Sequence, residues 1–78
     1  MQLTYTLIDR TRGFERDIIV PADQTIFDTI RILIDNGCMH NVTDETIRVK
    51  SLRTGLYVDM NSTYEENGIY NGDKVEIL

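Results

Sequence analysis

The sequence is poor in the residues that build disulfide bonds, metal sites and catalytic pairs. Its 78 residues contain one cysteine, one histidine and one proline. One cysteine cannot form an intrachain disulfide, which a secreted domain of this size would usually need. Cys38 and His40 supply fewer protein ligands than a zinc ion requires, and no third group orients them as a nucleophile and base. We therefore expect no metal centre, no catalytic residue and no enzyme activity.

Positive charge and long apolar runs are also scarce. The chain carries 8 Lys and Arg residues against 13 Asp and Glu residues, a formal net charge of −5. Nucleic acids and anionic membrane surfaces attract concentrated positive charge, so neither is an expected partner. The apolar-rich stretch 26–34 is interrupted by Asp28 and Arg31 and is too short to span a bilayer. No basic segment followed by an apolar run opens the chain, so we expect a cytoplasmic protein.

The glycines are isolated turn residues and form no phosphate-binding loop, so we expect no cofactor. The length permits a single domain, residues 1–78, with one core. Alternating apolar and polar residues, bounded by polar turns, predict five short strands around one helix. The expected strands are residues 2–8, 14–20, 46–52, 56–58 and 74–78.

The expected helix lies between the second and third strands. From Ile26 to Ile34, apolar residues recur at i, i+3 and i+4 spacing. Thr25 followed by Asp28 resembles a capping box, and Gly37 is a natural left-handed C-cap. The order ββαβββ predicts an α+β domain with the helix across one sheet. The last strand can pair beside the first, which makes the sheet mixed.

Residues typical of one fold occur along nearly the full chain. They are Met1-Gln2 opening a strand, Pro21 closing the next strand, Asp23-Gln24-Thr25-Ile26 entering the helix, Tyr64, Gly68-Ile69, and Gly72-Asp73 before the last strand. In these features and their order the chain resembles ubiquitin. The resemblance implies a ubiquitin-like β-grasp fold, a mixed sheet crossed by one main helix. None of these features is a catalytic motif, which favours a binding function.

The C-terminus differs from that of ubiquitin. Ubiquitin-type modifiers and sulfur carriers end in a flexible Gly-Gly tail, whose carboxylate is activated by an adenylating enzyme. This sequence ends in Val75-Glu76-Ile77-Leu78, inside the last expected strand. We therefore expect a non-conjugating protein that acts through its folded surface.

The C-terminal half resembles a bacterial family more closely. Thr54-Gly55-Leu56 and the ending 68–78 are similar to the YukD/EsaB-type proteins of Gram-positive bacteria. These are ubiquitin-like proteins without Gly-Gly, and their genes accompany the type VII (WXG100, ESAT-6-like) secretion apparatus. The resemblance implies a cytoplasmic accessory or regulatory component. Its partner would be another protein of that machine, either a membrane component or the ATPase.

Ubiquitin-like domains commonly bind partners through the exposed face of the third and last strands. The matching positions here are charged: Arg48 and Lys50 on the third strand, Lys74 and Glu76 on the last, and Arg53 in the adjacent turn. Four of the eight basic residues therefore share one expected face. We expect this face to bind an acidic protein surface through electrostatic complementarity. The alternative is that these residues are only the solvated side of half-buried strands.

Other interpretations remain open at this stage. Tyr57, Met60 and Tyr70 either add an exposed aromatic or soft apolar area or form the edge of the core. The protein as a whole is either the secretion component described above, a modifier or sulfur carrier with a truncated tail, or an interaction domain of a larger polypeptide. A Gly-Gly encoded after Leu78 would favour the carrier.

Overall fold

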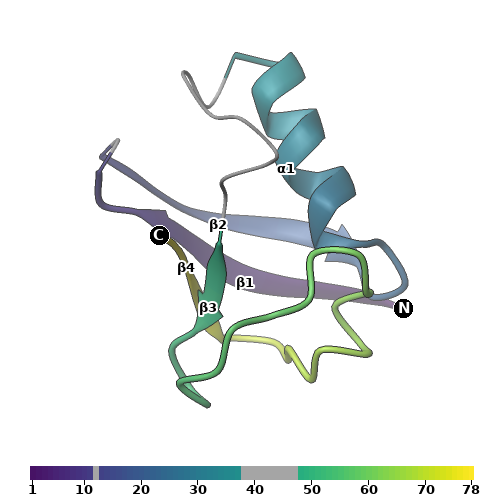
Figure 1. Cartoon of the computed structure of the whole chain (residues 1–78). Helices are drawn as coiled ribbons and strands as arrows, with labels where there is room; N and C mark the ends of the chain where they lie inside the picture. The colour runs from purple at the N-terminus through teal and green to yellow at the C-terminus, as the bar shows by residue number, and fades with distance from the viewer. Residues whose placement is uncertain (12, 38–47) are drawn as a thin grey trace.

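In the part of the chain that the structure describes, four strands form one mixed sheet, with one helix across it (Figure 1). The computed structural model describes residues 1–11, 13–37 and 48–78. The strand order across the sheet is β2-β1-β4-β3, with β1 and β4 parallel and the other neighbours antiparallel. The elements are β1 (Gln2–Asp9), β2 (Phe14–Pro21), α1 (Ile26–Asp35), β3 (Val49–Ser51) and β4 (Lys74–Ile77).

Alternation in β1 decides which face of the sheet is buried. Leu3, Tyr5 and Leu7 point to one face and are almost inaccessible to solvent. In β2, Val20 lies opposite Leu3 in the antiparallel register and is buried with it. Because side chains in a strand alternate between faces, the polar residues between them are left on the other side. This is the half-buried pattern that the sequence predicts.

Helix α1 covers the buried face of the sheet (Figure 1). It begins after Thr25, whose hydroxyl accepts a hydrogen bond from the Asp28 N–H at 3.1 Å, as the capping pattern predicts. It ends at Asp35, and Asn36 is its C-cap residue. Gly37 then adopts a left-handed conformation with φ of 73°, so its C-capping role is confirmed.

The core lies between α1 and the sheet, and every element contributes to it. Its buried side chains come from the four strands, from α1, from the turn between β2 and α1, and from the segment that links β3 to β4. They are Leu3, Tyr5, Leu7, Val20, Ala22, Ile26, Ile30, Val49, Tyr64, Ile69, Val75 and Ile77. The core therefore depends on contacts between residues that are distant in the sequence.

The prediction of a fourth strand at residues 56–58 is wrong. This segment forms an isolated bridge between Tyr57 and Lys50, with hydrogen bonds from the Ser51 N–H to the Leu56 carbonyl (2.9 Å) and from the Val58 N–H to the Val49 carbonyl (2.8 Å). The chain reverses over residues 52–55 and turns away again after Val58, so the pairing cannot lengthen. The sheet order and the single helix agree with the predicted α+β β-grasp architecture.

The other strands differ from the prediction only at their boundaries: β1 and β2 are each one residue longer than predicted, and β4 ends one residue earlier. The third strand is Val49–Ser51, shorter than the predicted 46–52; Thr46 and Ile47 lie outside the described residues, and Leu52 already belongs to the following turn. Cys38 and His40, which were weighed as chemical groups, also lie outside the described residues. No described helix has the length and apolar character needed to cross a bilayer.

Two tyrosines form a hydrogen-bonded pair in the core. The hydroxyl oxygens of Tyr5 and Tyr64 lie 2.6 Å apart, and their ring centroids are 5.0 Å apart. Burial raises the pKa of the Tyr5 phenol far above its ordinary value, and the neighbouring Tyr64 raises that pKa further. Burial also raises the pKa of Tyr64. Both phenols are therefore held in their neutral form in the folded protein.

The tyrosine pair predicts a loss of stability at alkaline pH. The unfolded chain releases these protons near pH 10 while the folded chain keeps them, so their stabilising contribution is complete below about pH 10 and declines as the pH rises further. We expect the free energy of unfolding, measured with urea, to fall above that pH. Tyr5→Phe should reduce the slope of this fall because it removes one retained proton. An unchanged slope in Tyr5→Phe would contradict the assignment.

Candidate protein-interaction face

Strands β3 and β4 place their charged residues on the face of the sheet away from the core. Val49 and Ser51 of β3 and Val75 and Ile77 of β4 are buried. Alternation therefore directs Lys50, Lys74 and Glu76 to the opposite side. Lys50 and Glu76 are direct neighbours in the antiparallel register of these strands. Arg48, Lys50, Lys74 and Glu76 are called the β3–β4 face below.

Glu76 is already paired within the chain. Its carboxylate lies 3.0 Å from the Arg10 guanidinium, and its side chain is only 12% exposed. Sequence reasoning missed Arg10 as a member of this region. The parallel register places Ile8 beside Glu76, which brings Arg10, two residues further along, to the same face. Because Arg10 neutralises Glu76, the β3–β4 face presents net positive charge.

Arg48 brings an aromatic side chain to this region. Its guanidinium carbon lies 6.0 Å from the ring centroid of Tyr57, within the range of a cation–π contact. Tyr57 is 60% exposed, and the neighbouring Leu56 is similarly exposed. Tyr57 therefore extends the charged area, while Met60 is half-buried and packs against the core. Tyr70 is exposed but belongs to a different contact, described next.

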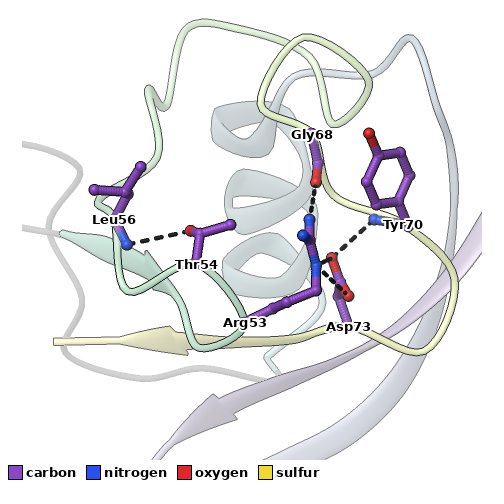
Figure 2. A network of polar contacts seen from close by, with 6 residues as sticks. All are labelled: Arg53, Thr54, Leu56, Gly68, Tyr70 and Asp73. Carbon is purple, nitrogen blue, oxygen red and sulfur yellow. Dashed lines mark hydrogen bonds and ion pairs between the residues drawn. The ribbon is translucent and has the colours of Figure 1, made fainter.

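The guanidinium of Arg53 forms hydrogen bonds and an ion pair within the chain, as Figure 2 shows. Its Nε donates to both carboxylate oxygens of Asp73, at 3.0 and 3.1 Å, and its Nη2 donates to the Gly68 carbonyl. The Tyr70 N–H donates to the same carboxylate at 3.0 Å, and the Tyr70 ring lies 5.0 Å from the guanidinium carbon. These four residues, called the Arg53 clamp below, tie the turn after β3 to the loop before β4.

The clamp changes the role expected of Arg53. Asp73 is only 8% exposed, and its charge is balanced by Arg53. Arg53 thus fixes the loop that leads into β4 and sets the position of Lys74 at the start of that strand. Its side chain stays 46% exposed. Of the five predicted interface residues, Arg48, Lys50 and Lys74 are the cations without an ion pair in the described part of the chain.

The described residues contain no cluster of three or more side chains suited to a metal ion. A protein-family model that matches the sequence was not found, and no curated protein is significantly similar to it. The comparison with known proteins therefore rests on solved structures that are similar to this chain.

Solved structures similar to this chain include several ubiquitin-like proteins. A de novo design based on ubiquitin has 25% identity and a TM-score of 0.74, covering 99% of this chain and 87% of the design. The ubiquitin-like domain of Plasmodium falciparum Dsk2 has 17% identity and a TM-score of 0.73, covering 99% and 96%. Caldiarchaeum subterraneum ubiquitin has 15% identity and a TM-score of 0.73, covering 99% and 91%. The chain therefore has the ubiquitin-like β-grasp fold.

Proposed function

We propose that this protein acts by non-covalent binding, docking its β3–β4 face on an acidic surface of another protein. The observation that carries the proposal is the concentration of Arg48, Lys50 and Lys74 on one face of a chain whose net charge is −5. A positively charged face on a protein of negative net charge favours a specific acidic partner. The reason is that complementary potentials guide association and exclude wrong partners. Ubiquitin-like domains generally bind proteins, which supports the same class of function.

The proposed setting is the cytoplasmic side of a Gram-positive type VII secretion apparatus. The proposed role is that of a non-conjugating accessory or regulatory component, which is not an enzyme. Support comes from the resemblance of residues 54–56 and 68–78 to the YukD/EsaB-type proteins. The partner is then a membrane-anchored component or the ATPase of that apparatus, and it contributes an acidic surface. Gene neighbours encoding WXG100 proteins and an FtsK/SpoIIIE-like ATPase would strengthen this assignment.

Charge reversal on the β3–β4 face tests this function in cells. In a host that encodes this protein beside a type VII apparatus, the pair Arg48→Glu and Lys50→Glu is expected to abolish secretion of WXG100 proteins. The reason is that two repulsive contacts replace two attractive ones at the partner's acidic surface. The measurement is the amount of WXG100 protein in the medium, with the level of the variant inside the cell as its control.

A matched control reverses charge elsewhere on the surface. Arg31 is exposed on α1, and its guanidinium stacks on Phe27 at 5.8 Å, so Arg31→Glu makes a similar change away from the β3–β4 face. Secretion should continue in the Arg31→Glu strain. Normal secretion in the strain carrying both β3–β4 substitutions would exclude this face as the binding site.

A further inference from the structure

Asparagine is followed by glycine at three places in the chain: Asn36-Gly37, Asn67-Gly68 and Asn71-Gly72. This dipeptide is prone to spontaneous deamidation, because glycine has no Cβ to shield its backbone nitrogen. That nitrogen attacks the side-chain carbonyl carbon of the asparagine, and ammonia leaves as a five-membered succinimide ring closes. Water then opens the ring to an aspartate or an isoaspartate, so an amide and a water become a carboxylate and an ammonium ion. The fold decides which of the three sites can react.

Asn67 is held in place by its own side chain. Its amide nitrogen donates to the Asp59 carbonyl at 3.0 Å, and its amide oxygen accepts from the Asp59 N–H at 2.9 Å. The nitrogen that would attack belongs to Gly68, whose N–H donates to the Glu65 carbonyl at 3.1 Å. The Gly68 carbonyl also accepts from Arg53 of the Arg53 clamp. Ring closure at Asn67 therefore requires the loop that contains these bonds to open.

Asn71 is held against β1. Its amide oxygen accepts from the Thr4 N–H at 2.8 Å, and the Gly72 N–H donates to the Thr4 carbonyl at 2.9 Å. The two groups that must meet, the side-chain carbonyl of Asn71 and the nitrogen of Gly72, are thus each bonded to the same residue of β1. The Thr6 N–H then donates to the Asp73 carbonyl at 2.9 Å, which continues the pairing toward β4. Reaction at Asn71 therefore requires this loop to separate from the sheet.

Asn36 differs, because its side chain forms no hydrogen bond with any other residue that the structure describes. It is exposed, as is Gly37, and it is the C-cap residue of α1. The Gly37 N–H donates to the Ile34 carbonyl at 3.0 Å, in the last turn of the helix. Ring closure needs a large rotation of ψ at Asn36 from its value of 5°, and among the described residues that rotation breaks this one hydrogen bond. Helix ends open at low cost, so this site is accessible to the reaction.

We propose that Asn36-Gly37 is a site of spontaneous deamidation and that the fold protects the other two Asn-Gly sequences. The co-reactant is water, the reaction needs no enzyme, and the product is an aspartate or isoaspartate at position 36. The site lies at the end of α1, outside β3 and β4. The proposal therefore does not depend on binding through the β3–β4 face.

Deamidation at this position destabilises α1. The new carboxylate lies at the C-terminal end of the helix, where the unpaired carbonyl groups already carry partial negative charge. Asp35 precedes it, and the last turn contains no basic residue to balance the two charges. An isoaspartate also adds one carbon to the backbone within the C-cap, which displaces the Gly37 N–H from the Ile34 carbonyl. Both products therefore weaken the helix that covers the core.

Ageing of the full folded chain at mildly alkaline pH tests the proposal, with peptide mapping by mass spectrometry as the measurement. We expect deamidation at Asn36 to be at least about tenfold faster than at Asn67 or Asn71, because the folded chain must open further at those two sites. Labelling by a protein isoaspartate methyltransferase identifies the isoaspartate product. In urea the three rates should agree to within about threefold, since the unfolded chain protects none of the sites.

Two substitutions at position 36 separate the reaction from its consequence. Asn36→Gln cannot close the five-membered ring, so the fast reaction should disappear. Asn36→Asp reproduces the charge of the aspartate product and should lower the melting temperature by a few degrees relative to Asn36→Gln. The proposal would be overturned by faster reaction at Asn67 or Asn71, by equal rates at all three sites in the folded chain, or by no deamidation at Asn36. Equal melting temperatures of the two variants would overturn the destabilising effect on α1.

Discussion

Ile30→Ala is expected to lower the free energy of unfolding by about 3 kcal/mol, because it removes buried methyl groups and leaves a cavity under the helix. Ile30 is 1% exposed and belongs to the core between α1 and the sheet. A domain of this size has little stability in reserve. The variant should therefore be largely unfolded near 37 °C or melt well below the unmodified protein. Urea unfolding followed by circular dichroism measures the change.

Ile32 provides a matched control on the same helix. It is the same residue type two positions later, but about half of it is exposed, so less apolar area returns to water on truncation. We expect Ile32→Ala to cost less than about 1 kcal/mol. Similar losses in both variants would contradict the orientation of α1 on the sheet.

Asp73→Ala is expected to lower the free energy of unfolding by about 2 kcal/mol, because it removes a buried carboxylate that accepts from Arg53 and from the Tyr70 N–H. The loss stays below that of a fully buried ion pair because Arg53 is partly exposed and water can solvate it. Urea unfolding at neutral pH gives the value. The exposed acid Glu65, changed to alanine, is the control and should change stability little.

A double-mutant cycle with Arg53→Met isolates the clamp itself. If Arg53 and Asp73 stabilise the loop through each other, the two substitutions together cost less than the sum of their separate costs. We expect an interaction energy of about 1 kcal/mol or more. Additive losses would show that the two side chains act independently, which the geometry of the Arg53 clamp does not allow.

The architecture was predictable because each element carries its own local signal. Alternation identified β1 and its buried face, and Thr25 and Gly37 correctly predicted where the helix begins and ends. The failure at residues 56–58 has a physical cause. Tyr57 and Val58 favour strands, but a strand exists only where a partner runs beside it, and the turns on both sides limit the pairing to a single bridge.

The candidate site was predictable only in part. The alternation of side chains along a strand correctly predicted that Lys50, Lys74 and Glu76 lie on one face of the sheet. The ion pairs of Arg53 with Asp73 and of Glu76 with Arg10 could not be predicted from local sequence patterns. In each pair the two residues come from distant parts of the chain. Arg10 reaches Glu76 only through the parallel register of β1 and β4.

Binding through the β3–β4 face is tested most directly by an NMR titration of the labelled protein with the cytoplasmic segments of the type VII membrane component and ATPase. Our account predicts shifts centred on Arg48, Lys50 and Lys74, and an affinity that falls as salt is raised, because salt screens exposed charges. Shifts that avoid these three residues, or an affinity indifferent to salt, would contradict it.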